Sequence, residues 1–63
     1  MNARQNQILK LLERDREISA SWLSFEVGAP EASIRRDIQV LRRNGHNVAF
    51  GLNGSYRIGQ SYK

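Results

Sequence analysis

The segment "VGAPEAS" (residues 27–33) places the end of one helix directly before the start of another. Gly28 suits the left-handed conformation that often follows the last residue of a helix. Pro30 suits the first position of a helix, where its missing N–H is not needed and its φ is already set. Because only Gly28 and Ala29 connect the two helices, we expect these helices to cross at a steep angle.

A helix is predicted on each side of this turn. The first covers about residues 20–27, and Ser19 before it is a suitable N-cap. The second covers about residues 30–44, because Ile34, Ile38 and Leu41 recur at helical spacing and form a buried edge. Asn44 and Gly45 end it. The pair forms a helix-turn-helix unit.

A further helix is predicted over about residues 3–16. The run "ILKLL" (residues 8–12) supplies its apolar stripe, and polar residues such as Gln5 are expected to face water. Ile18 then marks a short extended link that could add a small first strand. The N-terminal half of the chain is therefore predicted to be helical.

After Gly45 the pattern alternates, which predicts two β-strands within residues 46–58. A two-residue turn would place Tyr56 on the wrong face. A three-residue loop over residues 52–54, with Gly54 left-handed, pairs Phe50 with Tyr56 and Val48 with Ile58, so that all four apolar side chains share one face. We expect the second arrangement.

These elements predict a single α+β domain over residues 1–63, with three helices followed by a two-stranded β-hairpin and a polar tail (residues 59–63) that frays. The chain has 63 residues and no cysteine, so its core is small and no disulfide supports it. It has no apolar run long enough to span a membrane and no signal-peptide pattern. We expect a soluble protein of the cytoplasm, associated with the nucleoid.

The positive charge lies in the second half of the chain. The net charge is +4; residues 1–34 hold four basic and five acidic side chains, whereas residues 35–63 hold six basic and one acidic. Such a one-sided distribution suits a nucleic acid or an anionic membrane surface. Five of those six bases are arginine, which favours forked contacts over diffuse attraction.

The segment "ISASWLSFEVGAPEASIRRDIQVLRRNG" (residues 18–45) resembles the N-terminal DNA-binding domain of DeoR-type bacterial repressors and related small winged domains. With "QILKLL" before it and "YRI" after it, the likeness covers about residues 4–58. It implies a winged helix-turn-helix, with the third helix in the major groove and the hairpin, or wing, on the adjacent backbone or minor groove. The matching positions are Leu23, Gly28, Ser33, Ile34, Arg35, Arg36, Asp37, Leu41 and Gly45.

The exposed face of the third helix carries side chains that can read bases. Arginine can bridge O6 and N7 of guanine, and glutamine can bridge N6 and N7 of adenine. Because such a helix is usually inserted N-terminal end first, early positions are favoured and Gln39 needs deeper insertion. The candidate base-reading residues are Glu31, Ala32, Arg35, Arg36 and Gln39.

Other polar residues are candidates for the DNA backbone or minor groove, against plain solvation: Ser21, Arg42, Arg43, Asn53, Arg57 and Lys63. Asp37 is expected to be structural, fixing an arginine of the first or third helix. Neither Ala29 nor Pro30 can cap the third helix with a side chain. Its first N–H groups could therefore bind a phosphate, or the helix start is simply weak.

Trp22 and Phe25 lie three residues apart on the second helix and are unusual for the resembling family, which has polar residues there. One interpretation is that they fold over the first helix or the tail and enlarge the core. The other is an exposed aromatic patch that forms a protein interface with another copy or another protein.

No nucleophile motif, phosphate loop or carboxylate pair is present, and His46 is the only histidine. We therefore expect neither an enzyme nor a metal, cofactor or small-molecule ligand. We expect a small transcriptional regulator, a repressor of phage or mobile-element type, that binds double-stranded DNA sequence-specifically and acts by site occupancy, as a dimer or array. The alternatives are a recombination-directionality or architectural factor, and a protein-interaction module that uses Trp22 and Phe25.

Overall fold

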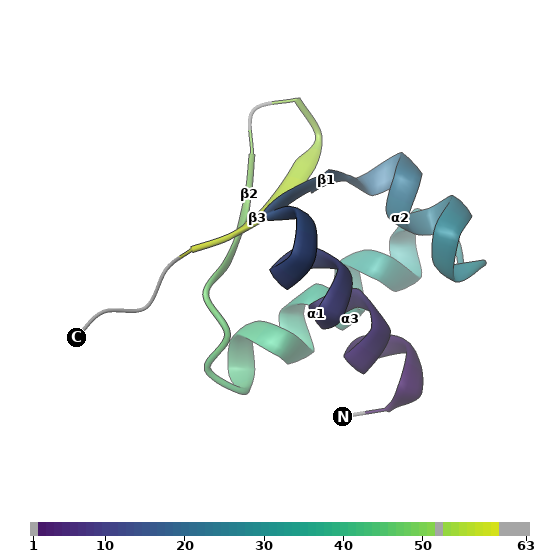
Figure 1. The fold of residues 1–63 in the computed structure, drawn as a ribbon. Coiled ribbons are helices and arrows are strands. Elements are labelled where there is room, and N and C mark those ends of the chain that lie inside the picture. The colour runs from purple at the N-terminus through teal and green to yellow at the C-terminus, as the bar shows by residue number, and fades with distance from the viewer. Residues whose placement is uncertain (1, 52, 60–63) are drawn as a thin grey trace.

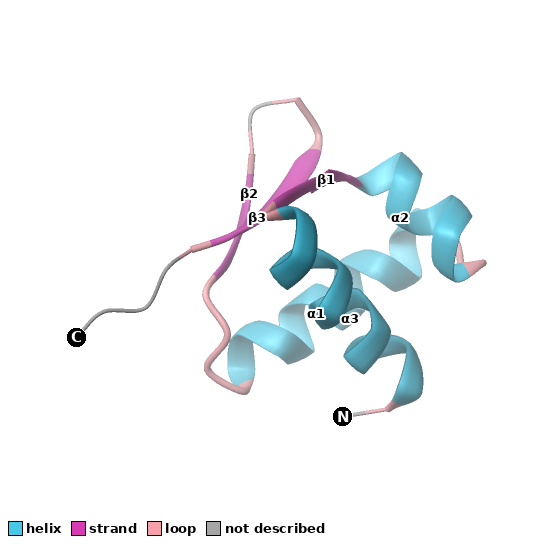
Figure 2. Cartoon of the chain, in the orientation of Figure 1, coloured by secondary structure: helices cyan, strands magenta, loops and turns pink. Residues whose placement is uncertain are grey.

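The computed structural model describes residues 2–51 and 53–59 of the chain (Figure 1). The predicted fraying tail therefore lies, except for its first residue, outside the described residues. The elements are α1 (Ala3–Asp15), β1 (Glu17–Ser19), α2 (Ala20–Val27), α3 (Glu31–Arg43), β2 (Val48–Phe50) and β3 (Ser55–Ile58). Three helices followed by an antiparallel hairpin make an α+β winged helix-turn-helix (Figure 2).

Helix α1 begins with a reciprocal cap that sets its first turn. The Asn2 side chain accepts a hydrogen bond from the Gln5 N–H (2.8 Å), and the Gln5 side chain accepts one from the Asn2 N–H (3.0 Å). The helix ends at Asp15, and Arg16, with a φ of 71°, turns the chain into β1. Ile8 and Leu12 are fully buried, so α1 contributes its apolar stripe to the core.

Helix α2 is capped at both ends, as its sequence predicts. The Ser19 hydroxyl accepts a hydrogen bond from the Trp22 N–H (3.1 Å). Gly28 is left-handed, with φ 71° and ψ 37°. The N–H groups of Gly28 and Ala29 both donate to the Ser24 carbonyl (3.0 and 3.1 Å). These bonds fix the turn between α2 and α3.

Pro30 is the N-cap of α3, so the prediction that it occupies the first helical position is wrong by one residue. Its φ of −61° fits a helix, but its ψ of 154° is extended. This conformation leaves the Pro30 carbonyl free to accept hydrogen bonds from the N–H groups of Ser33 (2.9 Å) and Ile34 (3.1 Å). Among the described residues, no side chain caps this helix start.

The sheet is antiparallel with the strand order β1-β3-β2. The predicted hairpin register is confirmed, because Val48 pairs with Ile58 and Phe50 pairs with Tyr56. Gly54 has the expected left-handed φ, 69°. The short strand suggested around Ile18 also forms, and it adds to the free edge of β3 as β1.

One residue of the hairpin does not reach the core. Val48 and Tyr56 are buried (2% and 4% exposed), whereas Phe50 is 64% exposed. The hairpin extends beyond the helices in Figure 1, so no helix lies under its outer end. The Phe50 ring instead packs edge-on against Tyr56, with ring centroids 5.4 Å apart. The four apolar side chains share one face of the hairpin, as predicted, but Phe50 is not buried.

The core is formed by all three helices and all three strands: Ile8, Leu12, Ile18, Ala20, Leu23, Ala29, Ile34, Ile38, Leu41, Val48 and Tyr56. Within the described ranges, no helix combines the length and apolar character that a membrane crossing requires.

Candidate nucleic-acid interface

Helix α3 has one buried and one exposed side. Ile34, Ile38 and Leu41 are buried against the rest of the domain. All seven residues predicted to contact DNA from this helix are exposed, and we call them the α3 ridge: Glu31, Ala32, Arg35, Arg36, Gln39, Arg42 and Arg43. Positions seven apart lie on one side of a helix, so Arg35 aligns with Arg42 and Arg36 with Arg43, each pair spanning about 10 Å.

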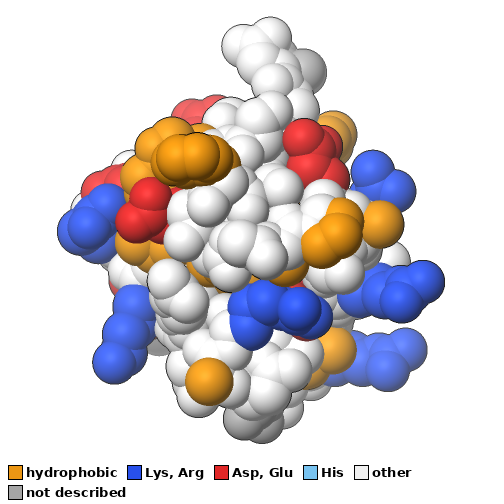
Figure 3. Space-filling view, turned by 90° about the vertical axis from the view of Figure 1, so that its right-hand side faces the viewer, with side chains coloured by type: hydrophobic (Ala, Val, Ile, Leu, Met, Phe, Trp, Pro, Cys, Tyr) orange, Lys and Arg blue, Asp and Glu red, His pale blue; other side chains and the backbone are white. Residues whose placement is uncertain are grey.

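The arginines of the α3 ridge are not neutralised within the described part of the chain. The salt bridges there join Arg4 to Asp37, Arg14 to Asp15 and Arg57 to Glu17, and none involves the ridge. Figure 3 shows basic side chains projecting from its right-hand edge, which is the far side of Figure 1, where α3 lies. The ridge therefore presents an open cationic surface.

A buried carboxylate fixes how α3 sits on α1. Asp37 is 3% exposed, and it accepts hydrogen bonds from Nε and Nη2 of Arg4 and from Nε2 of Gln5 (3.0 Å). The prediction that Asp37 fixes an arginine of the first or third helix is confirmed, and that arginine is Arg4. Gln5 was expected to face water, which is wrong: it is 8% exposed because it serves this carboxylate.

The same cluster determines the charge of Asp37. Burial alone would raise the pKa of Asp37, but the hydrogen bonds from Arg4 and Gln5 and the positive charge of Arg4 outweigh it. The pKa consequently lies below its ordinary value of 3.8, and Asp37 is an anion at neutral pH. Because this anion faces Arg4 on α1, the preceding side chain, Arg36, lies about 100° around the helix from that side and is exposed.

The first turns of α2 and α3 lie next to each other. The hydroxyl of Ser21 donates a hydrogen bond to Oε2 of Glu31 (3.4 Å), and both residues are exposed. The structure thus places Ser21, a candidate for backbone contact, beside the first residue of the α3 ridge.

The wing carries its predicted contact residues on different parts of the hairpin. Asn53 is exposed at the turn. Arg57 is exposed on β3, and its Nε lies 3.9 Å from Oε1 of Glu17, its partner on β1. Phe50 is a surface residue that the sequence reasoning missed, because its alternating pattern predicted burial. Lys63 lies outside the described residues.

Neither aromatic residue of α2 joins the core. Phe25 is 83% exposed and Trp22 is 38% exposed. The interpretation that they enlarge the core is therefore wrong for both residues, because neither belongs to the core cluster or to the partly buried residues packed against it. Ala20 and Leu23 already occupy the buried side of α2, so Phe25 has no place there.

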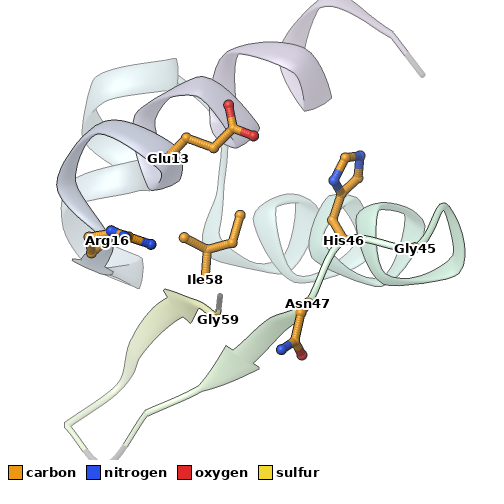
Figure 4. A pocket seen from close by; sticks show the side chains of 7 residues that line it. All are labelled: Glu13, Arg16, Gly45, His46, Asn47, Ile58 and Gly59. Carbon is orange, nitrogen blue, oxygen red and sulfur yellow. The ribbon is translucent and has the colours of Figure 1, made fainter. Parts of the chain in front are cut away.

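A pocket of about 310 Å³ lies between the end of α1, the α3–β2 connection and the end of β3 (Figure 4). It is lined by Glu13, Arg16, Gly45, His46, Asn47, Ile58 and Gly59. In the residues that the structure describes, His, Asp and Glu side chains form no group of three or more that could hold a metal ion. This pocket is separate from the α3 ridge.

A helix-turn-helix whose second helix presents exposed arginines, followed by a β-hairpin, defines a winged helix-turn-helix DNA-binding domain. A family model described as a DeoR-like helix-turn-helix domain matches residues 4–54, and the chain belongs to this family. Comparisons with curated proteins and with solved structures gave no significant match. The family makes the chain a DNA-binding regulator in general terms, with double-stranded DNA as its partner.

Replacing Asp37 by asparagine should destabilise the fold by about 1–2 kcal/mol, because the amide keeps the volume but loses the charge-assisted hydrogen bonds from Arg4, which is itself partly exposed to water. Urea denaturation at pH 7 measures the change. The lowered pKa means that the Asp37 contribution is present above about pH 4, the unfolded value, and is lost as the pH falls through the folded value. The difference between wild type and variant should therefore shrink in acid.

The matched control is Asp15→Asn, which removes an exposed carboxylate that pairs with Arg14 on the surface. Exposed pairs contribute little, so this variant should unfold at the wild-type urea concentration. Equal stability of Asp37→Asn and Asp15→Asn at pH 7 would contradict the anchoring role of Asp37.

Proposed function

We propose that this chain is a small regulator that binds double-stranded DNA sequence-specifically and acts by occupying its site. The observation that carries the proposal is the α3 ridge, exposed and free of ion pairs among the described residues. A helix with its side chains is about 10–12 Å wide, which matches the width of the major groove of about 12 Å. With 13 residues, α3 is about 20 Å long and can lie along that groove.

In this proposal the first turns of α3 read the base edges. Arg35 and Arg36 make forked contacts to guanine, and Gln39, one turn further on, contacts adenine. Glu31 accepts from cytosine N4, and Ala32 contacts a thymine methyl group. These base contacts are supported by one observation: all of the side chains are exposed on the same helix, which follows the turn of the helix-turn-helix.

The backbone contacts are proposed for residues around that ridge. Arg42 and Arg43 lie at the C-terminal end of α3 and are proposed to contact the phosphates at the edge of the groove. Ser21 lies beside the N-terminal end of α3. On the wing, Asn53 and Arg57 are exposed and are proposed to contact phosphate or the minor groove, and Lys63 follows in the tail.

Site occupancy is proposed as the mode of action. The longest dimension of the domain is 34 Å, close to the length of ten base pairs. A module of this size covers enough duplex to exclude another protein from the same site. We propose a repressor of phage or mobile-element type that acts on the nucleoid in the cytoplasm.

A second candidate function is an architectural or recombination-directionality factor that bends DNA. The observation that favours it is Phe50, a 64% exposed ring on the wing that rests against the buried Tyr56. Apolar side chains on minor-groove elements can enter between base steps and kink the duplex. In a gel, the mobility of a bent complex depends on where the binding site lies within the DNA fragment, whereas the mobility of an unbent complex does not. This measurement distinguishes bending from simple occupancy.

Binding to random-sequence duplex DNA should depend strongly on salt. If about five phosphates are contacted, log K should fall with log salt at a slope of about −4 to −5, because each contact releases condensed counterions. Mobility shifts at several salt concentrations measure this slope. The proposed function would be refuted by absence of binding at low salt, which would favour a protein-interaction module instead.

Replacing Arg35 or Arg36 by alanine should weaken binding to a site selected from a random pool by about 1–3 kcal/mol each. Both side chains are exposed, so the thermal unfolding of the variants should match the wild type. The loss should be larger on the selected site than on random DNA. An equal loss on both would show that these arginines contact only the backbone.

A further inference from the structure

The outer face of α2 carries aromatic surface that the proposed DNA contacts do not use. Trp22 is 38% exposed and Phe25 is 83% exposed, and residues three apart on a helix are neighbours. Together they present about 250 Å² of aromatic surface, using ordinary side-chain areas. We call Trp22 and Phe25 the α2 patch. Two of the three large hydrophobic residues that are exposed in the described chain lie in it.

The charges around the α2 patch have both signs. Glu26 follows Phe25 on α2, and the end of α1 carries Arg14 and Asp15, which are joined by two hydrogen bonds of 2.8 Å. The hydrogen bond that Arg14 donates to Asp15 raises the pKa of Arg14 most, and the negative charge of Glu26 also raises it. Helices α1 and α2 contact each other directly. In Figure 3, which faces the α2 side, hydrophobic, acidic and basic side chains lie close together.

This mixture does not suit DNA. A phosphate backbone would meet the carboxylates of Asp15 and Glu26 here, whereas the α3 ridge offers it four arginines. An aromatic centre with a rim of both charges is the composition of a protein interface. A rim that contains both signs can also complement its own copy, because each acid can face a base or a helix N-terminus of the other.

We propose, on the basis of the proposed function, that the α2 patch binds the same patch of a second copy of this chain when both copies occupy neighbouring DNA sites. The contact is two-fold symmetric, with the two α2 helices antiparallel. Phe25 of each copy then packs against the partner's Trp22, and the acidic and basic groups of the two rims face one another.

The size of the patch explains why DNA is needed. A stable interface buries about 800 Å² on each partner, roughly three times the area of the α2 patch. The free protein should therefore be monomeric. Two copies held on one duplex have an effective concentration in the millimolar range, at which a small contact is sufficient. The patch lies opposite the side of α2 that packs into the core, so the contact leaves the α3 ridge free.

The test is a mobility-shift titration on duplexes that carry one copy of a selected site, two inverted copies or two direct copies, over a series of spacings. The wild type should bind two inverted copies, at one spacing, at least tenfold more tightly than the single-site affinity predicts. Direct copies should bind independently, since a two-fold contact cannot form between them. Sedimentation of the free protein at the same concentrations should show a monomer.

Phe25→Ser should reduce the cooperativity on inverted copies to within twofold of independent binding and leave the single-site affinity unchanged. Because Phe25 is highly exposed, its replacement should not affect folding. Phe25→Leu, which keeps an apolar side chain, should retain part of the cooperativity. The matched control is Phe50→Ser, which removes an exposed aromatic residue from the wing. Its affinity for a single site can change, but its cooperativity, measured relative to its own single-site affinity, should equal that of the wild type.

Three results would overturn the inference while leaving DNA binding intact: independent binding at every spacing and orientation, cooperativity that survives Phe25→Ser, or a stable dimer without DNA. Absence of binding to all of the duplexes is a different failure. It would refute the proposed function itself, on which this inference depends.

Discussion

The ion pair and hydrogen bonds around Asp37 decide which side of α3 faces outward. Successive residues of a helix are about 100° apart, so a rotation by one position would carry Arg36 towards α1 and expose Asp37. A buried carboxylate is tolerated only when it is paired, and Arg4 and Gln5 supply that pairing in one orientation. The apolar side chains Ile34, Ile38 and Leu41 favour the same orientation through burial. The arginine surface is thus a consequence of interactions on the opposite side of the helix.

The α2–α3 turn adds the second constraint, because it fixes where α3 begins. Gly28 reverses the chain without steric strain, and the Ser24 hydroxyl donates a hydrogen bond to the Ala29 carbonyl. With Pro30 as N-cap, the first turn of α3 emerges next to the start of α2 and carries Glu31 beside Ser21. The turn and the Asp37 cluster together set the position and the rotation of the α3 ridge.

Much of this arrangement could be predicted from the sequence. Helices and their ends were predictable because caps, glycine and periodicity act locally, and the hairpin register followed from keeping Val48, Tyr56 and Ile58 on one face. Gln5 was mispredicted because its partner Asp37 is distant in sequence, although Asn2 and Gln5 have the spacing of a reciprocal helix cap. Phe50 was mispredicted because alternation gives the direction of a side chain but not how far the helices extend beneath it. The exposure of Phe25 depends on tertiary packing in the same way.

The surface is divided between two chemistries: arginines on α3, and aromatic residues with mixed charges on α2. The most direct test of the central claim is an NMR titration of ¹⁵N-labelled protein at low salt with a short duplex that carries one selected site. The largest amide shifts should fall on residues 31–43 and on the wing around Asn53 and Arg57. Shifts confined to the outer face of α2, or to the pocket lined by Glu13 and His46, would contradict the account.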